Sequence, residues 1–304
     1  MPVERRHLLL FAIMCTIWGS TWIAIRLGVA EIPPFSFAAL RHLAAGLLLL
    51  GIARRLGASM TPGASLPRLV ASALFVNTGC YALLFWGMQS VPSGLSAVIQ
   101  LALLPVGLFG VGLLFGEEVF SRRKAAGVAL GLAGLLVLFW PRLSPSGGAG
   151  ELAGMAAIAL STFSLAIGFV LSRALLRNID LPLLAAQQNL IGAAGLFVLA
   201  ALFEPFSAAS VAALARPAVL ASWIFLVLGG SIVAFTIYLE LLRAWGPVRA
   251  GLNAFVSPVI AVVIGVVLFA EPFGAHELAG SMVMLLAAGL VIRDPRLATV
   301  EGPS

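Results

Sequence analysis

The sequence predicts an all-α integral membrane protein of ten transmembrane helices, arranged as two inverted five-helix repeats. Three observations predict this fold class: a scarcity of charge, apolar runs of bilayer length, and a weak similarity between the two halves of the chain. Of the 304 residues, 61% are apolar and only 10% are charged, with a mean hydropathy of +1.10. A soluble domain carries about a quarter charged residues. The outer surface must therefore face lipid rather than water.

Charge-poor segments recur along the chain with short gaps between them. A backbone amide at membrane depth needs a hydrogen-bond partner within its own segment, so apolar runs of this length must be helical. The uncharged runs of the fifth and tenth segments are short for a bilayer of about 30 Å, and their flanking side chains must reach toward the surface. We expect helices near 8–27, 35–53, 68–88, 94–116, 124–140, 151–173, 181–203, 217–240, 249–270 and 276–292.

The first segment follows a charged start and resembles the front of a signal peptide. Its uncharged run from Leu8 to Ile25 has 18 residues. That length suffices to span a bilayer, so we interpret the segment as a retained helix. The gaps between the later segments carry helix breakers, which lie at Pro33-Pro34, Pro62-Gly63, Pro92-Ser93-Gly94, Pro145 to Gly150 and Gly246-Pro247.

The distribution of Lys and Arg predicts the orientation in the membrane. If the amino terminus is cytoplasmic, the outer segments hold only Arg26, Arg142 and Arg216. The inner segments then hold fourteen cations, which are Arg5, Arg6, Arg54, Arg55, Arg68, Arg122, Arg123, Lys124, Arg173, Arg177, Arg243, Arg249, Arg293 and Arg296. This positive-inside bias predicts a multi-pass protein of the cytoplasmic (inner) membrane with both termini in the cytoplasm.

The two halves of the chain resemble each other at fixed offsets in residue number. Each half would hold five helices, an odd number, so the second half must insert upside down. The inner loop Arg-Arg-Lys at 122–124 accordingly aligns with the cation-free outer loop Ala-His-Glu at 275–277. We assign 1–145 to the first repeat, 146–297 to the second and 298–304 to a polar tail. The offset is 153 for Gln100 with Asn253 and for Gly127 with Gly280, and 147 for Arg41 with Gln188.

Polar and aromatic side chains recur at helical spacing inside the predicted helices. Residues three and four apart share one face of a helix. Side-chain amides are costly in lipid, so they should face the bundle interior or water. The alternative for each is that it hydrogen-bonds one helix to another as a structural contact. The candidates for substrate binding are Trp18, Asn77, Tyr81, Gln100, Ser231, Phe235, Tyr238, Asn253 and Ser257.

Two further features bear on a cavity between the repeats. Trp18 and Tyr81 would form apolar walls, and Trp18 would also offer a cation–π face. Arg41 lies within the second helix, and with its repeat mate Gln188 it forms a candidate charged or polar pair of the second and seventh helices. A charge at this depth suggests function, but its mate is neutral. We favour structural anchoring by Arg41 over capture of a substrate carboxylate.

The sequence lacks the signatures of several other chemistries. Cys15 and Cys80 lie inside apolar runs, so we expect no disulfide framework and no metal site. We see no nucleotide-binding loop and no basic stripe for nucleic acid, and we expect no cofactor. The predicted helices carry no Asp or Glu at mid-membrane depth, which favours uniport or weak coupling over an obligatory proton relay. The expected partners are a small-molecule substrate and the lipid bilayer, and assembly as a homo-oligomer stays open.

Several short motifs together resemble a known family. They are Trp18-Gly19-Ser20, the run Arg41 to Gly46, Pro105 followed by Leu-Phe-Gly-Glu-Glu at 114–118, Ser257-Pro258, and Leu-Phe-Ala-Glu-Pro at 268–272. In this order and spacing they resemble the EamA-type transporters of the drug/metabolite transporter superfamily. The resemblance implies a central cavity lined by helices 1, 3, 4, 6, 8 and 9, and substrates such as amino acids, most often exported. One departure is Leu165-Ala166, where the family often has Trp-Ala, which puts an aromatic wall on that side in doubt.

These observations predict a secondary transporter that moves amino acids or related small metabolites by alternating access, with export favoured. The alternatives are an intramembrane enzyme acting on lipids and a non-transporting membrane scaffold. An enzyme of that kind needs clustered catalytic groups. His7, His42 and His276 lie on different segments and on opposite sides, so we expect no enzyme.

Overall fold

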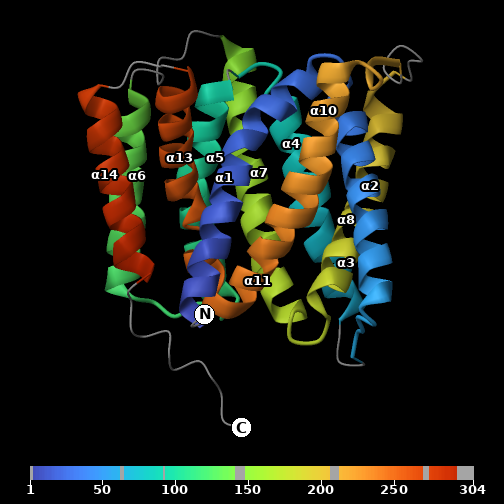
Figure 1. Cartoon of the computed structure of the whole chain (residues 1–304), viewed down its shortest axis with the longest axis horizontal. Coiled ribbons are helices and arrows are strands. Elements are labelled where there is room, and N and C mark those ends of the chain that lie inside the picture. The colour runs from blue at the N-terminus through green and yellow to red at the C-terminus, as the bar shows by residue number, and fades with distance from the viewer. Residues whose placement is uncertain are drawn as a thin grey trace.

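The computed structural model describes residues 3–61, 65–91, 93–140, 148–205, 212–269 and 274–292. Helices account for nearly all of these residues and stand side by side as rods (Figure 1). Within the same residues, β-pairing is limited to one isolated antiparallel bridge between Met60 and Ile179. The predicted repeat boundary at 145/146 and the tail 298–304 lie outside the described residues.

The helices fall in the ten ranges that the apolar runs predict, and the predicted fold class is confirmed. Two of the rods are composite, because each contains a π-helical segment that continues the α-helix on either side. The elements are α1 (Val3–Val29), α2 (Pro34–Arg55), α3 (Leu66–Ala73), η1 (Leu74–Gly79), α4 (Cys80–Gly87), α5 (Ser93–Leu114), α6 (Arg122–Phe139), α7 (Ala149–Leu175), α8 (Leu181–Phe203), α10 (Pro217–Phe225), η3 (Leu226–Ala234), α11 (Phe235–Trp245), α12 (Pro247–Ala250), α13 (Asn253–Phe269) and α14 (Ala275–Ile292).

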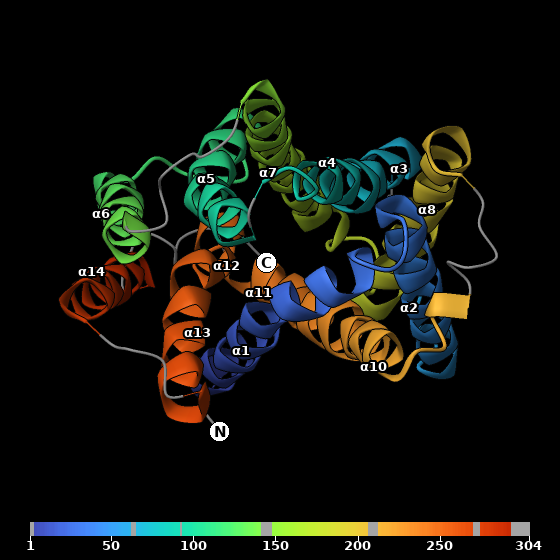
Figure 2. The ribbon, with the colours of Figure 1, turned by 90° about the horizontal axis from the view of Figure 1, so that it is seen from above.

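Most rods have the length and the composition of membrane spans. Among the described residues, six are at least 18 residues long and apolar enough to cross a bilayer. They are α2, the rod α3–η1–α4, α5, α7, α8 and the rod α10–η3–α11. The short α6 and α14 pack along each other at one edge of the bundle (Figure 2). Each therefore covers a face of the other that would otherwise meet lipid.

The helix pairing has the symmetry of an inverted repeat. The second predicted helix, α2, packs along the seventh, α8, and the fifth, α6, packs along the tenth, α14. The fourth helix contacts the sixth, and the first contacts the ninth, which is the same contact with the halves exchanged. In Figure 1, α1 begins at the lower edge whereas its mate α7 begins at the upper edge. The two halves therefore run in opposite directions through the bundle.

Two glycine contacts between α6 and α14 show the repeat register at atomic detail. A Cβ added at Gly127 would lie 2.3 Å from Cγ2 of Val291, and one at Gly280 would lie 2.7 Å from Cβ of Leu138. Gly280 lies 153 residues after Gly127, and Val291 lies 153 residues after Leu138. The two contacts are therefore equivalent when the halves are exchanged. Small residues let membrane helices approach closely. The residues that the repeat alignment pairs thus make equivalent packing contacts in the two halves.

The π-helical segments η1 and η3 occur at matching places in the two halves. A π-helical turn is rare and is often found at functional sites. It also adds a residue to the turn, which rotates every later side chain by about 100° relative to a continuous α-helix. The apolar pattern of the sequence predicts two continuous helices here and does not reveal the wide turns.

Polar groups from distant segments complete some of the helix ends. Pro33 precedes α2 and supplies no side-chain cap. Instead Glu204, at the end of α8, accepts from the backbone N–H of Phe35 at 2.5 Å and of Ser36 at 2.8 Å. At the other end of the bundle, the Asp180 carboxylate accepts from the N–H of Ser59 at 2.8 Å. Each of these bonds ties one half of the chain to the other.

Candidate functional site

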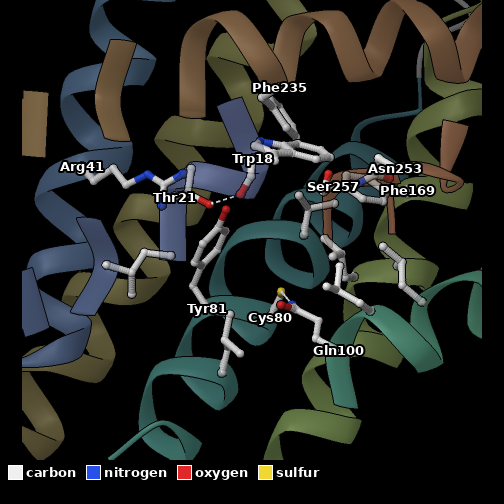
Figure 3. A pocket seen from close by; sticks show the side chains of 16 residues that line it. Trp18, Thr21, Arg41, Cys80, Tyr81, Gln100, Phe169, Phe235, Asn253 and Ser257 are labelled. Carbon is white, nitrogen blue, oxygen red and sulfur yellow. Dashed lines mark hydrogen bonds between the residues drawn. The ribbon is translucent and has the colours of Figure 1, made fainter. Parts of the chain in front are cut away.

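A cavity lies between the two halves, near the middle of the bundle, with about 820 Å³ of unfilled space including its mouth (Figure 3). It is bordered by α1, α2, η1, α4, α5, α7, α11 and α13. These helices include all six that the family resemblance implies, and α2 adds one residue, Arg41. The lining residues are Trp18, Thr21, Ile25, Arg41, Val76, Cys80, Tyr81, Leu84, Gln100, Leu101, Leu104, Leu165, Phe169, Phe235, Asn253 and Ser257.

The structure brings together seven of the residues that the sequence singles out. Trp18, Tyr81, Gln100, Phe235, Asn253, Ser257 and Arg41 all line this cavity. The other four, Asn77, Ser231, Tyr238 and Gln188, are buried behind its wall and are absent from the lining. A role in substrate binding stays a prediction for the seven.

The amide of Asn77 bonds two helices together behind the wall. Its Nδ2 donates to the carbonyl oxygen of Gln188 at 2.7 Å. The side chain of Gln188 in turn donates to Ser72 at 2.9 Å and to Ser172 at 2.7 Å. Gly192 makes room for this contact, because a Cβ there would lie 2.2 Å from Cβ of Asn77. In the structure these two amides make helix-to-helix contacts of the kind that polar residues provide in membranes.

The expectation that Asn77 and Tyr81 share a cavity face differs from the structure. Asn77 lies in η1 and contacts α8, whereas Tyr81 lies in α4 and lines the cavity. The second half shows the same division, with Ser231 in η3 and Phe235 in α11. The wide π-helical turn between the two positions changes the phase of the helix, so a constant period of 3.6 residues misplaces one of each pair.

Arg41 and Gln188 are repeat mates that make different contacts. The Nε of Arg41 donates to Oγ of Ser231 at 2.8 Å, on the eighth predicted helix. Gln188 contacts the third predicted helix, the repeat mate of the eighth, through Ser72, and it also contacts the sixth through Ser172. The two therefore occupy equivalent places in the two halves, and each contacts its own set of partners.

Aromatic rings close one end of the cavity. Phe169 and Phe235 line it, and the fully buried Tyr238 lies beyond them. The Tyr238 ring centroid is 4.1 Å from that of Phe169 and 5.2 Å from that of Trp18. Phe169 lies one helical turn after Leu165, where the sequence departs from the family pattern. An aromatic wall is thus present on that side, supplied by a residue that the motif comparison did not select.

The repeat-related amides Gln100 and Asn253 face the cavity from α5 and α13. Nε2 of Gln100 lies 3.9 Å from Sγ of Cys80, as a weak hydrogen bond. In the orientation that satisfies both neighbours, the amide nitrogen of Asn253 donates to the Ala250 carbonyl at 3.1 Å. Each amide therefore keeps further hydrogen-bonding capacity for a molecule in the cavity.

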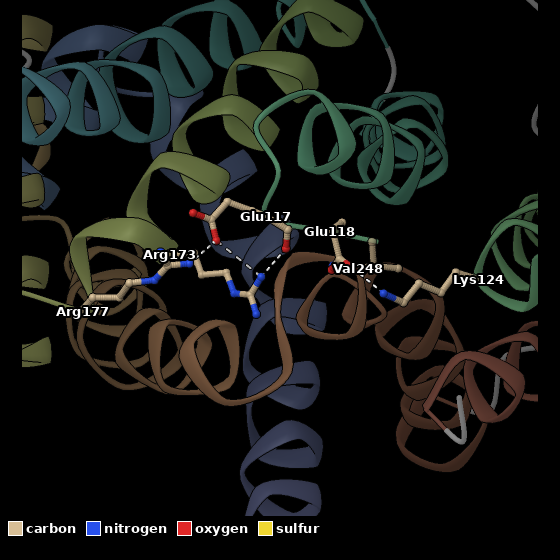
Figure 4. A network of polar contacts seen from close by, with 6 residues as sticks. All are labelled: Glu117, Glu118, Lys124, Arg173, Arg177 and Val248. Atoms are coloured by element: carbon tan, nitrogen blue, oxygen red, sulfur yellow. Dashed lines mark hydrogen bonds and ion pairs between the residues drawn. The ribbon is translucent and has the colours of Figure 1, made fainter. Parts of the chain in front are cut away.

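A buried ionic cluster lies beyond the aromatic end, about one turn past Phe169 along α7 (Figure 4). Glu118 forms an ion pair with Lys124, and both side chains are only 2% exposed. The second oxygen of Glu118 accepts from the backbone N–H of Val248 at 3.1 Å. Through these two contacts Glu118 joins the start of α6 to the α11–α12 turn of the second half.

Glu117 makes the second part of the cluster. Arg173 donates to its backbone carbonyl, and Arg177 contacts its carboxylate at 2.9 Å. Gly246 turns the chain beside both parts with φ +79°, a conformation that favours glycine. A Cβ there would lie 3.1 Å from Glu118 Oε1 and 3.3 Å from Arg173 Cζ. The loop after α5, the end of α7 and the α11–α12 turn are thus held together.

The opposite end of the bundle carries a weaker ionic contact. Arg216 pairs with Glu31 there, but their side chains are 61% and 42% exposed. Exposed ion pairs contribute about 0–1 kcal/mol, whereas removing one partner of a buried pair costs about 3–5 kcal/mol. The described ion pair near Glu118 is thus buried in the packed bundle, whereas the one at the other end is exposed to solvent.

Comparisons with known proteins agree with this architecture. A model of the EamA-like transporter family matches residues 5–140 and 152–293, one copy in each half. The inner membrane transporter YedA of Escherichia coli K12 is 31% identical over 280 residues, covering 90% of this chain and 87% of that protein. PecM of Dickeya dadantii is 28% identical and covers 91% of this chain and 89% of that protein. The transporter YvbV of Bacillus subtilis is 29% identical, with 95% and 92% covered.

A solved structure resembles the whole fold. One crystal structure superposes with a TM-score of 0.78 at 19% identity, covering 98% of this chain and 99% of the other. A likeness at that identity shows the fold alone. The two matches of the family model span most of the sequence and coincide with the two packed halves. The chain belongs to the EamA-like transporter family.

Proposed function

We propose that this protein moves a small metabolite, an amino acid or a related compound, across the cytoplasmic membrane by alternating access, with export favoured. The observation that carries the proposal is the cavity at the junction of the inverted halves. Repeats of this kind hold substrate near the midplane and change access by rocking one half against the other. The family membership and the relatives named as transporters support the same function.

The character of the cavity supports a substrate that is partly apolar and partly polar. Trp18, Tyr81 and Phe235 supply aromatic surface, while Gln100 and Asn253 supply donors and acceptors. Ligand sites are commonly built in this way, with an apolar lining and a few placed polar groups.

The unequal ends of the bundle support an alternating mechanism. The cluster at Glu118 would close the cytoplasmic end, on the orientation that the positive-inside bias predicts. Transport then requires that this cluster open while the opposite end closes. Both termini are cytoplasmic in this proposal, and the transport is uniport or only weakly coupled to an ion.

The test is exchange of labelled amino acids by the purified protein in liposomes. Liposomes that contain wild-type protein and are preloaded with the unlabelled compound should take up the labelled compound from outside. Liposomes without protein should not. Gln100→Leu should slow this exchange, because it removes the polar group of a lining residue. Gln89→Leu makes the same chemical change at an exposed position outside the cavity and should leave the rate unchanged. No exchange above empty liposomes across a broad metabolite panel would contradict the proposal.

A further inference from the structure

The guanidinium of Arg41 is a buried charge with an incomplete set of partners. The residue is 2% exposed and lies at the edge of the cavity, with its head toward Thr21 and Tyr81 (Figure 3). Its Nε donates to Ser231, and its Cζ lies 5.2 Å from the Tyr81 ring centroid. Its Nη1 is buried and has no hydrogen-bond partner among the described residues. A buried charge with only some of its donors satisfied is costly at membrane depth.

The surroundings hold the guanidinium in place without neutralising it. A Cβ at Gly230 would lie 3.0 Å from Nη2 of Arg41, so the missing side chain at that position leaves the room that the head occupies. The nearby Thr21 hydroxyl donates to the Trp18 carbonyl at 2.7 Å, and Nη1 of Arg41 has no hydrogen bond to it or to any other described neighbour. Among the described residues that line the cavity, Arg41 is the one with a formal charge, and no carboxylate balances it. The cavity therefore offers a positive site to whatever enters it.

The repeat mate of Arg41 shows what a purely structural solution looks like in this fold. Gln188 is neutral, and its amide nitrogen donates to two serine hydroxyls, while its Oε1 is buried without a partner among the described residues. The charge is therefore present on one side of the pseudo-twofold axis only, and it faces the cavity. A single charge at one edge of the cavity gives a bound molecule a preferred orientation.

We propose that the cavity selects substrates that carry a carboxylate, and that Arg41 binds this group through its unpaired N–H donors. The proposal rests on the transport function proposed above and names its substrate class. A guanidinium has five donors in a fork that matches a carboxylate. A substrate ammonium finds no acidic partner among the described lining residues and is dispensable for recognition. This assignment replaces the structural anchoring that the sequence favoured for Arg41.

The test compares ligands that differ in one group, using thermal unfolding of the purified protein and exchange in liposomes. The probes are phenylalanine, phenylalaninamide and 3-phenylpropionate, with leucine, leucinamide and 4-methylpentanoate as an aliphatic set. We expect each carboxylate to be bound about 10- to 100-fold more tightly than its amide, as for a hydrogen bond to a charged group. The acids that lack an ammonium should bind about as well as the amino acids.

Substitution of Arg41 identifies the group responsible. Arg41→Gln should reduce the preference for acid over amide to less than about threefold, and Arg41→Lys should keep part of it, because the charge remains. Arg243→Gln removes a cation that is half exposed at the surface, and it should keep the full preference. If Arg41→Gln does not yield folded protein, Arg41→Lys tests the fork of donors: a reduced acid preference supports the assignment, and an unchanged one contradicts it.

Two results would overturn the inference while leaving transport intact. One is that wild-type protein binds and exchanges amides as well as the matching acids. The other is that a folded Arg41→Gln variant weakens acids and amides by the same factor. If wild-type protein exchanges none of these compounds and nothing else in a broad panel, the proposed transport function fails, and this inference fails with it.

Discussion

Glu118 offers a direct test of the closed end, because its loss strands a buried cation. Glu118→Gln keeps the shape and the acceptor for the Val248 N–H but removes the charge that pairs with Lys124. Removing one partner of a buried pair costs about 3–5 kcal/mol. When the cytoplasmic end opens, water can solvate Lys124. We therefore expect Glu118→Gln to destabilise the closed conformer and not the open one. A shift of 3 kcal/mol changes the ratio of two conformers by about 10²-fold.

The native cysteines supply the assay. The chain has two, and Cys15→Ala leaves Cys80, which lines the cavity. Inside-out vesicles expose the cytoplasmic face to a membrane-impermeant methanethiosulfonate reagent. Glu118→Gln should raise the rate at which Cys80 is modified from that face by about tenfold or more, as the open conformer becomes more populated. The closed conformer of the parent protein should protect Cys80.

Two controls separate opening from general damage. Glu31→Gln removes a carboxylate at the opposite end of the bundle, where Glu31 is 42% and its partner Arg216 61% exposed, and its effect should stay within about 1 kcal/mol. The double change Glu118→Gln with Lys124→Met removes both buried charges and should return the rate toward that of the parent. The reasoning is refuted if Glu118→Gln lowers the unfolding temperature without changing the modification rate, or if the double variant behaves as the single one.

Three further predictions concern packing and hydrogen bonds. Gly127→Ala places a Cβ against Val291 and should destabilise the protein by about 1–3 kcal/mol. Gly110→Ala, which meets no atom within 4 Å, should not, as thermal unfolding will show. Gln188→Leu leaves buried hydroxyls with fewer partners and should cost about 1–3 kcal/mol, with ligand affinity in a binding titration unchanged. Glu204→Ala removes the acceptor at the start of α2 and should cost about 1 kcal/mol, again read from thermal unfolding.

Much of the fold follows from the sequence, because the membrane allows few alternatives. Apolar runs of bilayer length must be helical, and the charge pattern and the offset of 153 together imply inversion. The pairs Gln100 with Asn253 and Gly127 with Gly280 then fall in equivalent places in the structure. These predictions depend only on spacing along the chain, which the fold preserves.

The details of the site depend on interactions that spacing does not contain. The π-helical turns rotate Tyr81 away from Asn77, and no residue type in those turns identifies them. Phe169 lines the cavity one helical turn after Leu165, at a position that the family motifs do not include. That Arg41 lacks a hydrogen-bond partner for Nη1 can be seen only once its neighbours from η3 are placed beside it. Sequence reasoning therefore locates the site better than it assigns the roles of its residues.

The pairing of α2 with α8 also constrains how the protein is made. The ribosome releases α2 well over a hundred residues before α8, so the small face of α2 around Gly46 must wait in the bilayer for its mate. A first half synthesised alone lacks the antiparallel surfaces for both α2 and α6. A second copy of that half supplies them only if it inserts with the opposite orientation. Joining the two halves in one polypeptide guarantees one of each orientation in every molecule.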